Sequence, residues 1–152
     1  MMNTTTLPIF RVAGLAANIR AEHAAADLSA LWQSWQQSSL QSNIHAFSRT
    51  IYCVYHQYQS NGDKQAVLGY LVPNDLDLPD ATADVWVLPQ QYAVYELPDK
   101  QPESAWTMWA QLPDDVQTQR ANKMDLENYP SFGLPKIYVG LVGQVEMTEE
   151  AL

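Results

Sequence analysis

The sequence predicts an α+β domain in which a β-α-β-β unit occurs twice, giving one antiparallel sheet with two main helices on one side and a central cleft. Stretches rich in β-branched and aromatic residues alternate with two amphipathic helical stretches. The two helical stretches carry similar cores, LWQSW and AWTMW, which indicate an internal repeat. We expect residues 1–152 to form a single domain with pseudo-repeats at about 5–75 and 84–148.

The first predicted unit begins with an apolar strand over residues 7–17. A helix over residues 24–40 follows, because leucines and tryptophans recur there at spacings of three and four. Residues 50–58, TIYCVYHQY, are typical of a strand. The turn signal SNGD then predicts a hairpin with a return strand over residues 66–72.

The second predicted unit repeats this plan. Residues 85–97 read as a strand that is interrupted by a proline. Pro102 is placed to begin a helix, and Pro113 to end it. Strands over residues 124–129 and 136–145 complete the unit.

Charge and cysteine content exclude several classes of protein. The net charge is −9, with 17 acidic against 8 basic residues, so binding to nucleic acid or to an anionic membrane is not expected. No apolar run approaches the ~20 residues of a membrane span, and the N-terminal residues do not resemble a signal peptide. We therefore expect a cytoplasmic protein. Cys53 is the single cysteine and has apolar neighbours, which favours a buried thiol.

Motifs of conventional enzymes are missing. The chain has no GxSxG, HExxH, GxxxxGK[ST] or GxGxxG sequence. His23, His45 and His56 are isolated, with no carboxylate at metal-ligand spacing. We expect no catalytic residue, no bound metal and no cofactor.

Aromatic residues are abundant, with five Trp and eight Tyr. Many of these rings must pack in the core, but some can line a cleft and stack on a flat or cationic ligand. The alternation in MDLENY puts Glu127 and Tyr129 on one face of a strand. Glu127 is then either an acid exposed to water, an acid paired with Lys123 or Lys136, or a lone buried acid among aromatic rings, where its pKa would rise.

Four segments have a distinctive order along the chain: VYHQYQSNGDKQAVLGYLV, QQYAVYEL, AWTMW and DLENY…KIYVGL. Together they resemble the effector-binding domains of AraC-type regulators, which are GyrI-like small-molecule-binding domains of bacteria. The standalone integron-cassette effector-binding proteins are the most similar group. The resemblance implies a duplicated, SHS2-type β-α-β-β fold and a pocket for cationic lipophilic compounds.

The resemblance also assigns roles to individual residues. In the segment from Asp125 to Tyr129 it makes Glu127 the pocket acid, and it makes Tyr138 on the next strand part of the pocket wall. Tyr129 is expected to share that wall because it lies on the same face as Glu127. Two further pairs are either core residues or ligand contacts: Trp32 and Trp106, Tyr55 and Tyr70. The hairpin YHQYQSN departs from the family, which often carries three more acids there, and attraction of cations should be weaker.

We therefore expect a protein that binds cationic or aromatic small molecules without catalysis, as a standalone sensor or the effector module of a transcription regulator. A regulator or an enzyme encoded elsewhere is a possible protein partner. One alternative is an inhibitor of a macromolecular target, as gyrase-inhibitor-like members are, with an acidic surface that imitates nucleic acid. A third is a hydrolase of reactive electrophiles, in which Glu127 and Tyr138 would assist an attacking water.

Overall fold

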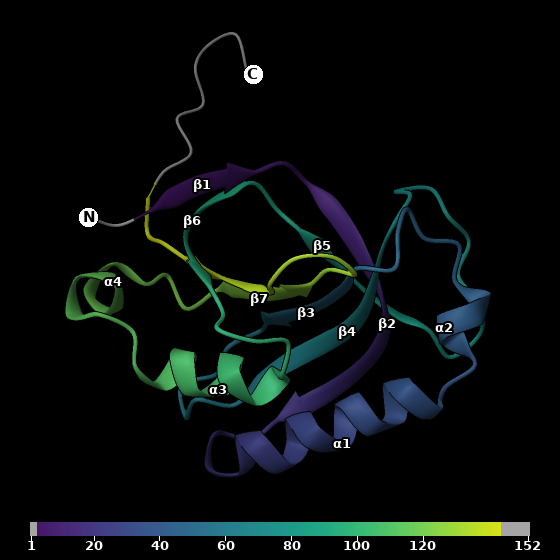
Figure 1. Cartoon of the computed structure of the whole chain (residues 1–152), viewed down its shortest axis with the longest axis horizontal. Coiled ribbons are helices and arrows are strands. Elements are labelled where there is room, and N and C mark those ends of the chain that lie inside the picture. Colours follow the sequence, from purple (N-terminus) through teal and green to yellow (C-terminus); the bar gives the residue numbers. More distant parts are fainter. Residues whose placement is uncertain (1–2, 144–152) are drawn as a thin grey trace, which may run out of the picture.

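The computed structural model describes residues 3–143, and in this part of the chain eight strands form one curled antiparallel sheet (Figure 1). The strand order is β1-β6-β8-β7-β3-β4-β2-β5. The strands are β1 (Thr4–Leu7), β2 (Phe10–Ile19), β3 (Ile51–His56), β4 (Lys64–Val72), β5 (Ala83–Val87), β6 (Gln90–Glu96), β7 (Met124–Tyr129) and β8 (Lys136–Gly140). The helices are the short 3-10 helix η1 (Ala21–His23), α1 (Ala24–Gln37), α2 (Leu40–Asn43), α3 (Pro102–Ala110) and α4 (Asp114–Gln119).

The strand order repeats the same unit on both sides of the sheet centre. The unit β2-α1-β3-β4 occupies one half and β6-α3-β7-β8 the other, and the two meet where β3 pairs with β7. Each unit is preceded by a short strand that crosses to the other half: β1 pairs with β6, and β5 pairs with β2. This arrangement confirms the predicted duplicated β-α-β-β fold with two main helices, while the exact repeat boundaries stay a prediction.

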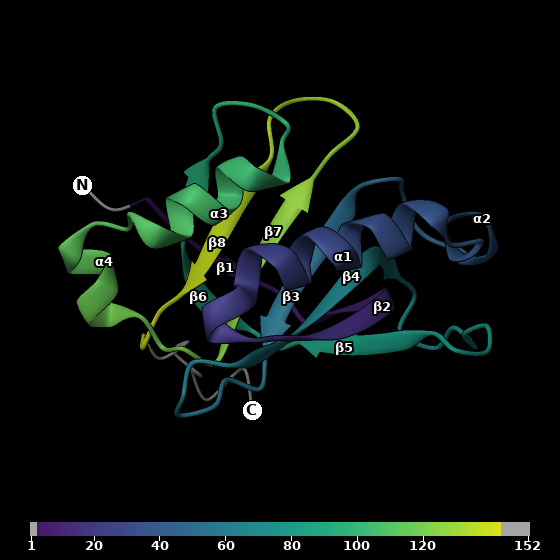
Figure 2. The ribbon, with the colours of Figure 1, turned by 90° about the horizontal axis from the view of Figure 1, so that it is seen from below.

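The two main helices lie on the same face of the sheet, α1 over the first half and α3 over the second (Figure 2). Leu28, Leu31 and Trp35 of α1 are buried against this face, as the apolar spacing predicts. On the opposite face, valines of β2, β3, β4 and β5 form a separate core with Tyr92 and Leu126. The sheet therefore has two buried faces, and only one of them is covered by α1 and α3.

Some predicted boundaries were wrong. The strand expected over residues 7–17 is two strands, because Pro8 cannot donate a backbone hydrogen bond and the chain turns there. The first helix ends at Gln37, where Ser38 takes an extended conformation, and not at residue 40. Helix α4 was not predicted at all. The last strand ends at Gly140, and residues 144 and 145 of its predicted range lie outside the described residues.

No helix among residues 3–143 has the length and apolar character that a membrane crossing requires.

Candidate functional site

The carboxylate of Glu127 lies at the centre of an aromatic cluster between the sheet and the two helices. Its side chain is on the helix-covered face of β7 and has an exposed fraction of 0%. Tyr129 donates a hydrogen bond to Oε1 at 2.5 Å. Tyr55 donates to Oε2 at 2.6 Å, and the indole Nε1 of Trp109 donates to the same oxygen at 2.7 Å. Two strands and α3 therefore converge on one buried acid through three neutral donors.

Burial raises the pKa of Glu127 above its ordinary value of 4.5. The hydrogen bonds from Tyr129, Tyr55 and Trp109 favour the charged form and oppose this rise, as does the positive charge of Lys64. The effect of burial on the pKa is the largest of these. The hydrogen bonds therefore hold the carboxylate in place but do not fully compensate for the hydration that its charge has lost. A cation that reached this carboxylate would supply the missing opposite charge.

A groove between α1 and α3 lies above this cluster. Its volume is about 210 Å³. Its lining residues come from α1 and from the start of α3: Ser29, Trp32, Gln33, Gln36, Gln101, Pro102, Glu103 and Trp106. The ring of Trp32 meets that of Tyr129 edge-on, with centroids 4.9 Å apart. The groove is thus separated from Glu127 by the rings of Trp32 and Tyr129.

Two indole groups at this groove lack hydrogen-bond partners. Nε1 of Trp32 and Nε1 of Trp106 are both buried, and neither finds an acceptor among the residues that the structure describes. Both side chains also pack against the cores of both halves, so each serves packing as well as lining the groove. A ligand with an acceptor group could satisfy these donors.

A second buried acid corrects the expectation that Glu127 is a lone negative charge. Asp125 has an exposed fraction of 0% and pairs with Nη2 of Arg120 at 3.0 Å. It also accepts hydrogen bonds from the backbone N–H of Gly140 at 2.7 Å and from the hydroxyl of Tyr58. The Arg120 guanidinium lies 5.2 Å from the ring centre of Trp109, so this ion pair borders the Glu127 cluster.

The other predicted site residues lie elsewhere. Tyr70 is buried against Trp35, with ring centroids 5.0 Å apart, and its hydroxyl accepts from Arg49 at 3.4 Å. Tyr138 is paired with Leu126 and not with Glu127, and adjacent strand residues face opposite sides. The expectation that Tyr138 shares a wall with Glu127 is therefore corrected: Tyr138 lies on the opposite face, in a separate pocket with Tyr52.

Sequence reasoning missed Trp109, Lys64 and the pair of Asp125 with Arg120. The MDLENY alternation does place Asp125 on the same face as Glu127, and the AWTMW core contains Trp109, so part of the signal was present. The expected buried thiol of Cys53 is confirmed, and it is directly opposite Glu127 on the neighbouring strand. No group of three or more His, Cys, Asp or Glu residues within the described range is arranged to hold a metal ion.

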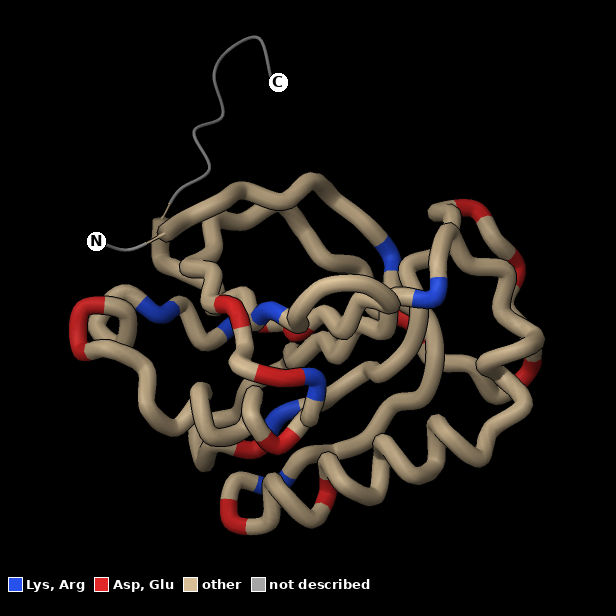
Figure 3. The backbone as a smooth tube through the Cα atoms, in the orientation of Figure 1, with Lys and Arg blue, Asp and Glu red and all other residues tan. Residues whose placement is uncertain are grey.

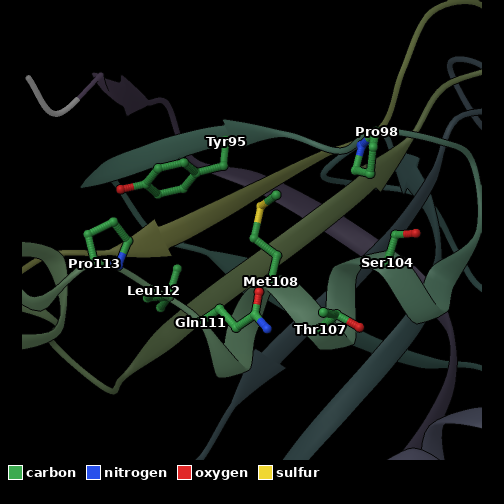
Figure 4. Close-up of a pocket in the computed structure, with 8 residues that line it drawn as sticks. All are labelled: Tyr95, Pro98, Ser104, Thr107, Met108, Gln111, Leu112 and Pro113. Carbon is green, nitrogen blue, oxygen red and sulfur yellow. The ribbon is translucent and has the colours of Figure 1, made fainter.

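A larger hollow of about 430 Å³ lies on the other side of α3. Tyr95, Pro98 and Met108 are among the residues that line it, and Figure 4 shows their side chains around it. None of its lining residues is charged, and none belongs to the Glu127 cluster. We therefore place the candidate site at the groove between α1 and α3.

The raised pKa of Glu127 predicts how the substitution E127Q changes stability with pH. The folded protein binds the proton of the Glu127 carboxyl group more tightly than the unfolded chain does. The stabilisation of the fold by this proton is therefore full below about pH 4.5 and is lost as pH rises through the pKa of Glu127 in the folded protein. The free energy of unfolding of E127Q, relative to wild type, should therefore increase from pH 4 to pH 8. Urea denaturation at several pH values measures this, with the exposed-site variant E22Q as control. A difference that does not change with pH would contradict the assignment.

The substitution R120M should destabilise the protein strongly. It leaves the carboxylate of Asp125 buried without its ion-pair partner, which costs about 3–5 kcal/mol in the free energy of unfolding. The double variant R120M/D125N should recover most of this loss. As a control, R20M removes a pair whose arginine is 55% exposed and should have a much smaller effect. Equal losses of unfolding free energy in R120M and R20M would show that the buried pair of Arg120 and Asp125 is not structurally important.

Three solved structures have a similar fold. An integron cassette protein from the mobile metagenome of Vibrio cholerae matches with a TM-score of 0.71 and 18% identity, covering 92% of this chain and 95% of that one. The protein SAV2435 bound to tetraphenylphosphonium matches with a TM-score of 0.75 and 12% identity over 100% and 99% of the two chains. A candidate transcription regulation protein from Staphylococcus aureus MU50 matches with a TM-score of 0.70 and 11% identity, covering 94% and 99%.

These identities are low, so the likeness shows the fold alone, a curled antiparallel sheet with few helices. No curated protein matches the chain significantly. The model of one family, the integron-associated effector-binding proteins, matches residues 4–147, which include both halves of the sheet and Glu127. The chain belongs to this family of integron-associated effector-binding proteins.

Proposed function

We propose that this effector-binding protein takes up lipophilic, aromatic cations between α1 and α3, with Glu127 as their counter-charge. The observation that carries the proposal is the carboxylate of Glu127, which is fully buried and, among residues 3–143, receives hydrogen bonds only from neutral donors. Such a carboxylate has lost its hydration without gaining an ion-pair partner. A bound cation would offset this cost, and the surrounding rings would add cation–π attraction.

Access to the acid requires a change in the aromatic rings. The groove of about 210 Å³ is below the 300–1,000 Å³ that is common for ligand pockets. Turning aside the rings of Trp32 and Tyr129 would join the groove to the space around Glu127. Binding would then break the hydrogen bond from Tyr129 and replace it with the charge of the ligand. We infer that the site is closed when empty and opens as the ligand enters.

One further observation supports this class of ligand, and another concerns the ligand's polar groups. The buried indole donors of Trp32 and Trp106 line the same groove and have no acceptor among the described residues, so a ligand that also carries an acceptor would gain hydrogen bonds there. SAV2435, which shares the fold, is recorded with tetraphenylphosphonium, a cation with four phenyl rings. A role as a sensor or as the effector module of a regulator, and a location in the bacterial cytoplasm, form part of the same proposal.

The alternatives have less support from the geometry. A hydrolase that uses Glu127 with Tyr138 would need both groups at one water, and the two residues lie on opposite faces of the sheet. An inhibitor that imitates nucleic acid would need its acids gathered on one surface. Acidic residues are instead spread over separate loops and helix ends, as Figure 3 shows.

The substitution E127Q should weaken binding of tetraphenylphosphonium at least tenfold, because it removes the negative charge and keeps the shape of the side chain. Quenching of tryptophan fluorescence measures the affinity, since Trp32, Trp106 and Trp109 surround the site. The exposed-site variant E22Q carries the same loss of charge and should bind as wild type does. Equal affinities of wild type and E127Q would refute the role of Glu127 as counter-charge.

A further inference from the structure

Lys64 holds its charge in an unusual position beside the Glu127 cluster. It begins β4 on the same face as Tyr55 and is only partly exposed. Its Nζ lies 4.4 Å from the ring centre of Tyr55 and 5.6 Å from that of Tyr58. Within residues 3–143, Lys64 has no carboxylate oxygen at ion-pair distance. The ammonium group is therefore held chiefly by the faces of two tyrosine rings.

The same two rings connect Lys64 to both buried acids. Tyr55 donates its hydroxyl proton to Glu127 at 2.6 Å, and Tyr58 donates to Asp125. Each phenol thus meets a cation at its ring face and an anion at its hydroxyl. Burial lowers the pKa of Lys64 below its ordinary value; the charge of Asp125 opposes this, that of Arg120 adds to it, and that of Glu127 opposes it.

The charges of this region balance when Lys64 is included. Asp125 and Glu127 are the two buried acids of the described residues, and Arg120 is paired with Asp125 at 3.0 Å. Lys64 is the remaining positive charge that acts on Glu127. It does so through the ring of Tyr55 and not by direct contact. The charges of Asp125, Glu127, Arg120 and Lys64 then sum to zero, although within residues 3–143 Glu127 itself has no ion-pair partner.

We propose that Lys64 is a resident cation that sets the charge selectivity of the site. This inference rests on the proposed function, because it concerns the same ligand pocket. A cationic ligand that approaches Glu127 would compete with Lys64 for the ring of Tyr55 and would be repelled by its charge. Lys64 therefore lowers the affinity for permanent cations.

Two probes of the same shape and opposite charge test this proposal. Tetraphenylphosphonium and tetraphenylborate each carry four phenyl rings, so a change in packing alone should alter both affinities in the same direction. Removing the charge in K64M should strengthen binding of the phosphonium at least tenfold and should not strengthen binding of the borate. The charge-conserving variant K64R should keep the wild-type ratio of the two affinities within about threefold.

Matched variants separate local from general effects. K100M removes a charge from an exposed loop and should leave the ratio unchanged. K64Q serves as a second neutral variant if K64M does not fold, and it should change the ratio in the same direction. An unchanged ratio in the folded neutral variant, or equal changes for both probes, would overturn the role of Lys64.

The outcome also distinguishes this inference from the proposed function. If E127Q loses phosphonium binding while the neutral Lys64 variant keeps the wild-type ratio, only the role of Lys64 is refuted. If neither wild type nor K64M binds the phosphonium, or if E127Q binds as wild type does, the proposed function fails and the inference fails with it. If the ratio of the phosphonium and borate affinities changes in K64M and returns to the wild-type value in K64M/E127Q, the result would support both the proposed function and the role of Lys64.

Discussion

The burial of one carboxylate in a cluster of aromatic donors is the interaction on which the rest of the site depends. Glu127 needs hydrogen bonds because water does not reach it, and it obtains them from Tyr55, Tyr129 and Trp109. These donors come from β3, β7 and α3, which belong to both repeated units. The requirement of this acid therefore ties the second helix to the centre of the sheet, at the place where the two halves meet.

The same arrangement relates packing to ligand binding. Trp32 covers Tyr129, and Tyr129 holds Glu127, so the rings that satisfy the acid also close the path to it. Asp125 and Arg120 form an ion-paired neighbour, in which Asp125 also accepts from the backbone N–H of Gly140 and Arg120 lies against the ring of Trp109. Only the acid without an ion-pair partner is available to a ligand charge. From this difference between the two buried acids we propose a structural role for Asp125 and a binding role for Glu127.

Part of this could be predicted from the sequence, because strand and helix periodicities can be read without knowledge of contacts. The alternation of MDLENY placed Glu127 and Tyr129 on one face, and the structure has them hydrogen-bonded. The repeated helix cores predicted two helices on one side of the sheet. Tyr138 was misplaced because its face depends on the register between β7 and β8, which neither strand shows alone. The positions of Lys64 and Arg120 were missed because their partners lie on other elements.

The central claim is that Glu127 is a buried acid whose charge is incompletely compensated until a cation binds. The most direct measurement is an NMR titration of its side-chain carboxyl group, with E127Q used to assign the signal. In the ligand-free protein the pKa should lie above 4.5, and saturating tetraphenylphosphonium should lower it. A pKa at or below 4.5 without ligand, or one that does not change when the cation is added, would contradict this account.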